Sequence, residues 1–208
     1  MSNEGKFFIG IGAVTLAVII VGVVFFAGGS KSGETKSIAV GELTAGGQTL
    51  GESTASAQIV EFGDYQCPAC GQAHPIVKQF LKDHGGSVYF VYRHFPLTQI
   101  HSNANPAARA AEAAGKQGKF WEMHDILFER QGAWSQMSDP QGKFEEYARE
   151  LGLDLEKFKA NREEAIGKIN ADADLGERAG VQSTPTFIIN GQIYAGVLTY
   201  DKLEELTN

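Results

Sequence analysis

Hydrophobic and polar residues divide the chain into an apolar N-terminal stretch, a polar segment and a longer region of mixed pattern. Residues 7–27 contain no charged side chain over 21 positions. About 20 apolar residues span the roughly 30 Å hydrocarbon core of a bilayer, so this stretch predicts a transmembrane anchor behind a cytoplasmic tail of residues 1–6. A cleaved signal peptide is the alternative, although its apolar part is normally only about 7–15 residues long.

The segment after this stretch is polar. Residues 28–55 are rich in Gly, Ser, Thr, Ala and Glu and hold few large apolar side chains, which is typical of a flexible linker. Residues 56–208 then alternate between strand-like and helix-like patterns, and their length is enough for one domain with its own core. We therefore expect an anchor, a linker and a single folded domain.

Two short apolar runs flank a helical pattern at the start of this domain. Residues 59–62 and residues 88–92 are apolar runs of the kind that form buried strands. Between them, apolar residues recur at helical spacing over residues 73–81. Pro75 interrupts this pattern and should kink the helix, and Gly85-Gly86 should end it. Strand, helix and strand predict a βαβ unit with a parallel strand pair.

A helical block and a hairpin complete the pattern. Residues 103–179 carry an alanine-rich segment and further apolar positions at helical spacing, which predict three to five helices. Residues 186–189 and 192–195 are strand-like and flank Asn190-Gly191, the strongest short hairpin signal. Residues 200–206 form a last helical segment. The predicted fold is α/β, with a helical insertion between a βαβ half and a ββα half.

The charge of the chain argues against one class of partner. The formal net charge is −7 at pH 7, and no basic cluster interrupts the acidic composition. Nucleic-acid binding is not expected, because it depends on a basic surface. The acidity is explained more simply as a solubility feature than as a binding specificity.

The candidate chemistry lies in the only two cysteines, Cys67 and Cys70, in the sequence Cys-Pro-Ala-Cys. They stand between the first predicted strand and the helix that follows it. Free backbone N–H groups and the dipole at a helix N-terminus stabilise a thiolate, which is the form that attacks disulfides. The second cysteine is close enough to close a small ring and release a bound partner. The pattern therefore predicts thiol–disulfide exchange.

Two other uses of the cysteine pair compete with thiol–disulfide exchange. A purely structural disulfide is disfavoured, because so short a loop restricts the unfolded chain little. A structural zinc site usually needs four Cys or His ligands, and the chain has no second Cys-x-x-Cys sequence. His74 lies four residues after Cys70 and could join the pair on one helix face, so a metal site stays open at this point.

Four stretches resemble one protein family. They are residues 61–70 (EFGDYQCPAC), 92–97 (YRHFPL), 117–125 (QGKFWEMHD) and 180–187 (GVQSTPTF). With them, residues 50–208 resemble the DsbA-type thioredoxin-fold disulfide oxidoreductases, of the membrane-anchored or secreted bacterial kind. The resemblance implies a thioredoxin fold with a helical insertion, here preceded by an N-terminal transmembrane helix.

The resemblance also implies roles for single residues. Cys67 would be the exposed nucleophile and Cys70 the more buried resolving thiol. Pro185 matches the cis-proline that faces the cysteines, and Thr184 before it would offer its backbone to a substrate strand. Glu61 matches a buried acid that assists proton transfer near the resolving cysteine. The alternatives are a trans proline at an edge strand and an exposed acid.

The dipeptide between the cysteines bears on the direction of exchange. Pro68 lacks an N–H group, which costs little in the first turn of a helix. Strong oxidants of the family carry histidine at the position of Ala69, and alanine cannot stabilise the thiolate in the same way. We still expect disulfide donation to exported proteins, because the chain lacks the dimerisation module of the family's isomerases. A reductase or isomerase-like role is one alternative, and a metal (copper or zinc) chaperone using Cys67, Cys70 and His74 is another.

The expected partners and location follow from the same resemblance. No soluble cofactor is implied beyond the redox-active disulfide of Cys67 and Cys70. The substrates would be unfolded or reduced exported proteins, and a quinone-linked membrane thiol oxidase would accept the electrons. We expect a monomer in the cell membrane, crossing it once, with its catalytic domain on the extracytoplasmic side. Disulfide chemistry suits such an oxidising compartment.

Overall fold

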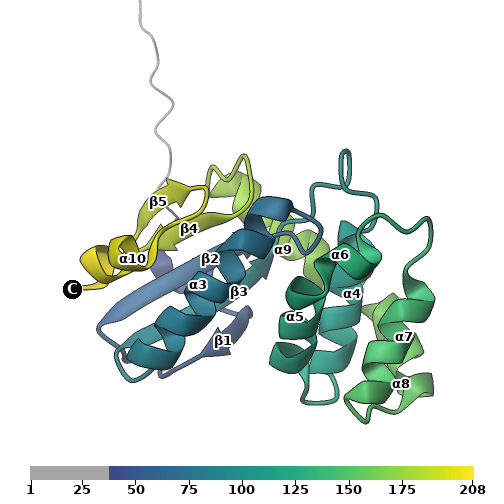
Figure 1. Cartoon of the computed structure of the whole chain (residues 1–208). Helices are drawn as coiled ribbons and strands as arrows, with labels where there is room; N and C mark the ends of the chain where they lie inside the picture. The colour runs from purple at the N-terminus through teal and green to yellow at the C-terminus, as the bar shows by residue number, and fades with distance from the viewer. Residues whose placement is uncertain (1–37) are drawn as a thin grey trace, which may run out of the picture. The chain divides into compact units, whose positions relative to one another are not determined.

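A mixed sheet forms the centre of the computed structural model, which describes residues 38–208 (Figure 1). Within these residues the sheet has five strands, in the order β1-β3-β2-β4-β5. The strands are β1 (Gln48–Leu50), β2 (Ala57–Gly63), β3 (Val88–His94), β4 (Thr186–Ile189) and β5 (Gln192–Ala195). Strands β2 and β3 are parallel, as the βαβ pattern predicted, and every other pair is antiparallel.

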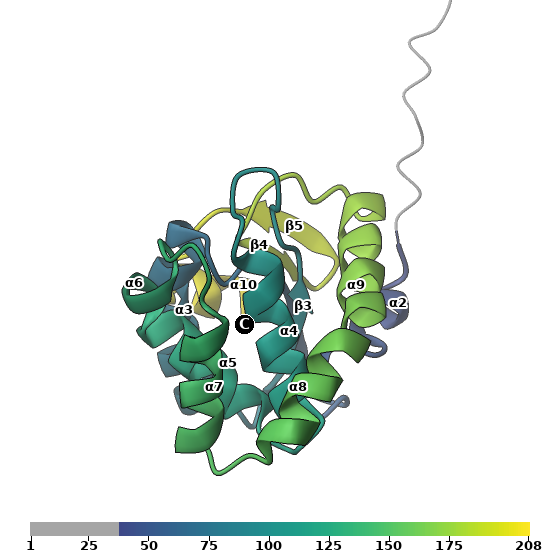
Figure 2. The same ribbon diagram turned by 90° about the vertical axis from the view of Figure 1, so that its right-hand side faces the viewer.

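The central strand β2 is buried on both faces, and its side chains alternate between two hydrophobic clusters. Ile59 packs in the cluster that contains helix α3 (Pro68–His84), whereas Val60 and Phe62 pack in the cluster on the other face. This alternation is the period of two that a strand imposes. Helices α3 and α10 (Tyr200–Thr207) therefore cover one face of the sheet, and α2 (Val40–Thr44) and α9 (Ile166–Arg178) cover the other (Figures 1 and 2).

The insertion lies between β3 and β4, as predicted, and contains six helices where three to five were expected. They are α4 (Ala104–Gly115), α5 (Phe120–Glu129), α6 (Gln131–Trp134), α7 (Gln141–Glu150), α8 (Leu155–Glu164) and α9. The extra element is α6, a single turn too short to show a helical period in sequence. Helices α4, α5, α7 and α8 pack together beside the sheet, and α9 returns along β3 (Figure 2).

The folded domain begins earlier than predicted. Helix α2 and strand β1 lie within residues 28–55, which the sequence assigned to a flexible linker. Leu43 of α2 is buried against the sheet, and β1 pairs with β3 along its whole length. Composition hid these elements, because β1 is an exposed edge strand held by backbone hydrogen bonds and α2 buries only one large apolar residue.

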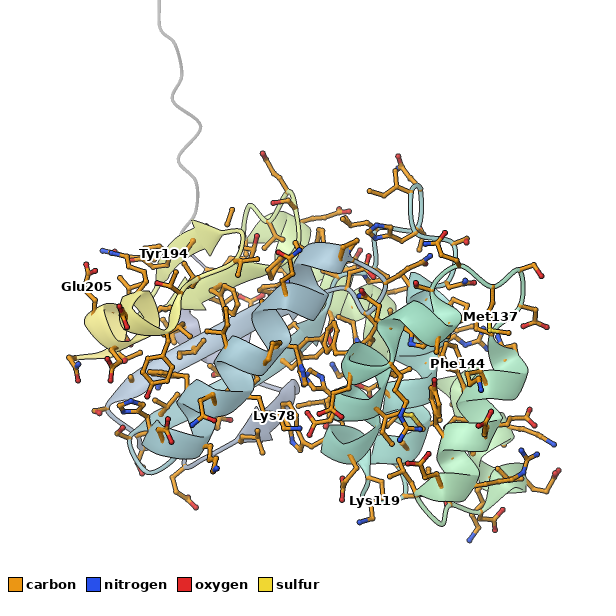
Figure 3. The ribbon with its side chains drawn as sticks, viewed as in Figure 1. Lys78, Lys119, Met137, Phe144, Tyr194 and Glu205 are labelled. Atoms are coloured by element: carbon orange, nitrogen blue, oxygen red, sulfur yellow. The ribbon has the colours of Figure 1, made fainter. Side chains whose placement is uncertain are left out.

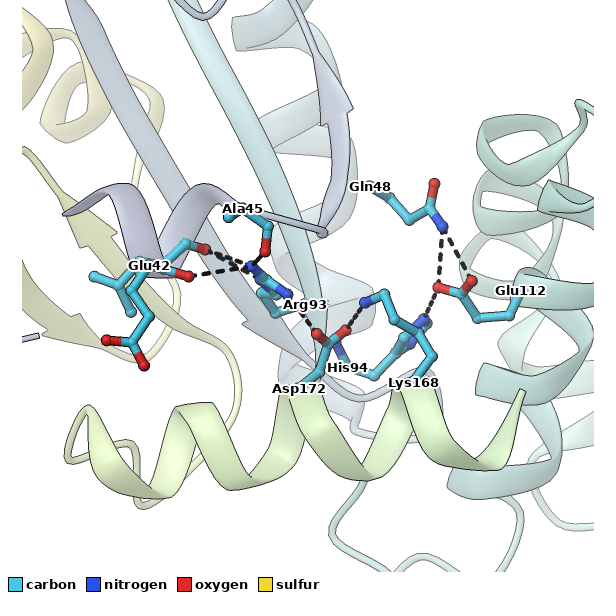
Figure 4. A network of polar contacts seen from close by, with 9 residues as sticks. Glu42, Ala45, Gln48, Arg93, His94, Glu112, Lys168 and Asp172 are labelled. Atoms are coloured by element: carbon cyan, nitrogen blue, oxygen red, sulfur yellow. Dashed lines mark hydrogen bonds and ion pairs between the residues drawn. The ribbon is translucent and has the colours of Figure 1, made fainter. Parts of the chain in front are cut away.

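A buried polar network fixes this N-terminal part to the sheet and to α9 (Figure 4). The Arg93 guanidinium donates to Asp172 at 2.6 Å and to the carbonyl oxygens of Leu43 and Ala45. On the neighbouring residue of β3, His94 contacts Glu112 of α4 at 2.8 Å. A buried charge is tolerated only when paired in this way, so the network holds four separate segments in one arrangement.

The predicted cytoplasmic tail (residues 1–6) and transmembrane segment (residues 7–27) lie outside the described residues. Among residues 38–208, no helix is both long enough and apolar enough to cross a membrane.

Candidate active site

The two cysteines lie where β2 leads into α3. Cys67 is the N-cap residue of α3, and its carbonyl oxygen accepts the first helical hydrogen bond, from Gly71 at 3.1 Å. Pro68 occupies the first helical position, where its missing N–H group is not needed. Both cysteines are free thiols. Cys67 keeps 7% of its surface exposed and Cys70 keeps none, so the predicted exposed nucleophile is largely covered although it is the more accessible of the two.

The surroundings of the sulfurs separate their pKa values. A hydrogen bond from the Cys70 thiol lowers the pKa of Cys67 to about 5. Burial opposes this shift, and the backbone N–H groups of Ala69 and Cys70 add to it. Burial raises the pKa of the Cys70 thiol far above its usual range. At neutral pH the reduced pair is therefore a Cys67 thiolate beside a Cys70 thiol. Ala69 contributes to this through its backbone N–H group, whereas the sequence analysis predicted an effect of its side chain alone.

The loop before β4 covers Cys67. The Thr184–Pro185 peptide bond is cis, which agrees with the prediction for Pro185. The Cys67 sulfur lies 3.3 Å from the carbonyl oxygen of Thr184, to which the protonated thiol donates. Thr184 is itself buried, and Thr186 behind it donates to the carbonyl oxygen of Ser183 at 2.7 Å. The backbone of Thr184 therefore lies beside the Cys67 sulfur, and its pairing with a substrate strand stays a prediction.

Glu61 is a buried acid rather than the exposed strand-edge acid of the alternative. It keeps 3% of its surface exposed, and burial raises its pKa to about 8. In the part of the chain that the structure describes, its carboxyl group makes no hydrogen bond and no ion pair. It faces a cavity of about 270 Å³ that His74, Trp121 and His124 also line. A carboxyl group in this setting is neutral at pH 7 and able to give up a proton.

Asp64, for which no role was predicted from sequence, stabilises the turn that leads to the cysteines. One carboxylate oxygen accepts from the backbone N–H of Gln66 at 2.8 Å. The other accepts from the N–H of Leu97 at 3.0 Å and contacts His101 at 2.7 Å. The backbone N–H of Asp64 lies 3.5 Å from the Cys70 sulfur. Asp64 and His101 both stand in or beside the family-like stretches, but their spacing of 37 residues carries no local signal.

The insertion also holds this turn. The Gln131 side chain donates to the carbonyl oxygens of Tyr65 and Cys67 at 2.8 and 2.9 Å. The Gln66 side chain donates to Ser135 at 2.7 Å and accepts from the N–H of Asn103 at 2.6 Å. The turn that contains Cys67 is therefore held by residues of the insertion more than 30 positions away in sequence.

A family comparison decides the identity of this fold. The sequence model of a family described as thioredoxin matches residues 44–208. The chain belongs to the thioredoxin family.

Solved structures place this thioredoxin-family chain beside DsbA-type thiol–disulfide oxidoreductases. A thioredoxin-like oxidoreductase from Silicibacter pomeroyi DSS-3 is 29% identical with a TM-score of 0.66, over 77% of this chain and 89% of that chain. Oxidised BdbD from Bacillus subtilis is 28% identical with a TM-score of 0.68, over 77% and 90%. The fold is also that of α-DsbA1 from Wolbachia pipientis, at a TM-score of 0.71. The resemblance stated from sequence is confirmed.

The curated relatives contradict the predicted localisation. The Na(+)/H(+) antiporter NhaA 1 of Salinispora arenicola is 43% identical over 156 residues, and NhaA 3 of Salinispora tropica is 42% identical. These matches span 74% of this chain but only 23% of the relatives' length. Proteins named as antiporters do not support a single-pass membrane protein with an extracytoplasmic catalytic domain, so that localisation was wrong as stated.

The structure of this thioredoxin-family domain groups His74 with other side chains than the two cysteines of the predicted metal site. Among residues 38–208, one group of His, Cys, Asp or Glu side chains lies close enough together to share a metal ion, and it is His74 with His124 and Asp125. His74 contacts Asp125 at 2.8 Å and does not group with the two sulfurs. A chaperone site made of Cys67, Cys70 and His74 is therefore not present as predicted.

Proposed function

We propose that the domain exchanges thiols and disulfides, with Cys67 as the nucleophile and Cys70 as the resolving thiol, and that it donates disulfides to reduced polypeptides. The observation that carries the proposal is the pair of unequal sulfurs: Cys67 has a pKa of about 5, and burial keeps Cys70 protonated. A thiol of low pKa is both a reactive thiolate and a good leaving group.

Disulfide donation takes two steps. A substrate thiolate attacks the Cys67 sulfur of the oxidised pair, the Cys67–Cys70 bond breaks, and the electron pair leaves on Cys70, which takes a proton. A second substrate thiol then attacks the substrate sulfur of the mixed disulfide and expels the Cys67 thiolate. The substrate loses two electrons and gains a disulfide, and the domain is left reduced. A thiol oxidase, which we predict to be a quinone-linked membrane enzyme, would take up these electrons.

Two residues assist in this proposal. The backbone of Thr184, beside the Cys67 sulfur, pairs with an extended substrate segment, so that main-chain groups rather than particular side chains give affinity. Glu61, neutral at pH 7 and close enough to Cys70 for its charge to raise the pKa of that thiol, supplies or accepts the proton of Cys70. We propose unfolded exported proteins as the substrates.

The opposite direction is the second candidate. Ala69 offers no side-chain donor to the Cys67 sulfur, and a less stabilised thiolate makes a weaker oxidant. In that case the domain would be kept reduced and would act as a reductase or isomerase.

A redox titration separates the two directions. The oxidised full-length chain is equilibrated with glutathione, and the fraction of reduced pair is measured by alkylation and mass spectrometry. A reduction potential near about −120 mV supports disulfide donation, and one near about −270 mV supports the reductase role. Oxidative refolding of a reduced model protein by the wild type and by Cys67→Ser tests the exchange itself. Refolding that is equally fast with Cys67→Ser contradicts the proposal in both directions.

A further inference from the structure

Three side chains with metal-binding atoms meet between the helix that carries the cysteines and the insertion. His74 lies one turn after Cys70 on α3, and His124 and Asp125 are neighbours on α5. One nitrogen of each imidazole and one oxygen of the carboxylate all lie within 4.8 Å of one another. Two ligand atoms at normal zinc distances in a tetrahedral site lie about 3.4 Å apart, so small side-chain movements would complete the site.

A second hydrogen bond orients one of the imidazoles. His124 Nδ1 lies 3.0 Å from the hydroxyl oxygen of Tyr65, which is fully buried. When Nδ1 carries the proton and donates to this oxygen, the lone pair is on Nε2. Histidine ligands of metal ions nearly always have such a partner on the second nitrogen, because it fixes the tautomer and the direction of the ring.

One cation already competes for the carboxylate. Lys78 extends from α3 toward α5, with its amino group 2.8 Å from Asp125 and 2.7 Å from Glu129 (Figure 3). Its side chain is 49% exposed. An ion at Asp125 would leave Lys78 paired with Glu129 alone, which is a small change for a surface side chain.

The cluster opens into the cavity described above. His74, His124 and Asp125 line the same space of about 270 Å³ as Glu61. The volume is ample for water, which needs about 30 Å³ per molecule in the liquid, so an ion could enter hydrated and keep a water ligand. Glu61 is an independent indication, since a carboxyl group buried to this degree usually has a partner.

We propose that His74, His124 and Asp125 bind a divalent first-row transition-metal ion in this cavity. Two imidazoles and one carboxylate are a donor set that suits Zn²⁺ and its neighbours and does not suit Mg²⁺ or Ca²⁺, which prefer oxygen. The site uses neither sulfur as a ligand, but it shares its cavity with Glu61, to which we assigned the proton of Cys70.

Zinc titration of the full-length chain tests the site. The protein is first oxidised, so that the Cys67–Cys70 disulfide removes both thiolates as ligands, and Zn²⁺ is added in a calorimeter. One equivalent should bind. His74→Gln and Asp125→Asn should each weaken binding at least about tenfold, and Tyr65→Phe, which removes the outer partner, should weaken it about 10–100-fold. His84→Gln is the matched control, because His84 lies on the same helix but contacts Tyr200 and Glu204.

X-ray absorption of the wild-type zinc complex gives a result that does not depend on the folding of any variant. A shell of nitrogen and oxygen with imidazole scattering and no sulfur supports the site. The proposal is overturned if the oxidised protein binds no Zn²⁺ at millimolar concentration, or if Mg²⁺ binds equally well. It is also overturned if folded His74→Gln and Asp125→Asn keep the wild-type affinity, or if binding requires the reduced cysteines.

Discussion

The sulfur of Cys67 lies 3.3 Å from the carbonyl oxygen of Thr184, a residue 117 positions away in the sequence. The contact joins the first half of the thioredoxin fold to the second across the whole helical insertion. Cys70, three residues further along the chain, has none of its surface exposed. Cys67 is therefore both the more accessible thiol and the thiol with the lower pKa. It should react first, and this order can be tested.

Cys67 should be alkylated before Cys70 in the reduced protein. Because the pKa of Cys67 is about 5, its thiolate is already formed at mildly acidic pH, where an ordinary thiol is protonated. Brief iodoacetamide treatment at about pH 6, followed by peptide mass spectrometry, should find the label on Cys67. The labelling rate should fall as the pH is lowered through about 5. Label found mainly on Cys70 would reverse the assigned roles.

Replacement of Cys70 should trap mixed disulfides on Cys67, because no thiol remains to release the substrate.

Two variants of Cys70 also test what lowers the pKa of Cys67. Cys70→Ala removes the hydrogen bond that contributes most, so the Cys67 pKa should rise, whereas Cys70→Ser retains an O–H donor and should raise it less. Ultraviolet absorbance of the thiolate against pH measures both. Equal pKa values in the two variants would show that this hydrogen bond is not the cause.

Ala69→His should make the domain a stronger oxidant. The imidazole adds a donor and partial positive charge beside the Cys67 sulfur, which stabilises the reduced form more than the disulfide. Each pKa unit by which Cys67 falls corresponds to roughly 30 mV in the reduction potential of this two-electron couple. Ala69→Gln adds a similar volume without charge and is the control. A potential that stays flat or drops in Ala69→His, with the fold intact, would mean that residue 69 does not act on Cys67.

Glu61 should make the protein less stable as the pH rises from about 4.5 to 8. Its pKa is 4.5 when unperturbed and about 8 in the fold, so over this interval the folded state binds more protons than the unfolded state. The free energy of unfolding therefore decreases across the interval, by up to roughly 5 kcal/mol. Glu61→Gln removes this dependence, and it should gain stability over the wild type at pH 8 but not at pH 4.

Urea unfolding at the two pH values measures the effect, with Glu122→Gln as the control because Glu122 is exposed on α5. If Glu61→Gln loses stability with pH just as the wild type does, then the carboxyl of Glu61 is not the group that titrates.

Local signals in the sequence predicted the elements that bear the site. The apolar run of β2, the helical spacing of α3 and the Asn190-Gly191 turn between β4 and β5 each depend on near neighbours, and each was located within a few residues. Helix α3 also continues through Pro75, which lies on its exposed side, and ends before Gly85 as expected.

Contacts between distant segments could not be predicted in the same way. The pairing of β1 with β3 depends on backbone groups that no composition reveals, and the partner of His74 is 51 positions away on α5. The sequence placed His74 with the cysteines because four residues form one helical turn. The packing of α5 against α3 instead places His74 beside His124 and Asp125.

The hydrogen bonds from Gln131 end on the carbonyl oxygens of Tyr65 and Cys67, not on any side chain. Hydrogen bonds to main-chain oxygens do not depend on which side chains follow in the sequence. Pro68 and Ala69 could thus be exchanged for other dipeptides without loosening the turn, and the redox potential would change while the geometry stayed the same. In this domain the insertion fixes the geometry of the turn, so that Pro68 and Ala69 alone can change the redox potential of the cysteine pair.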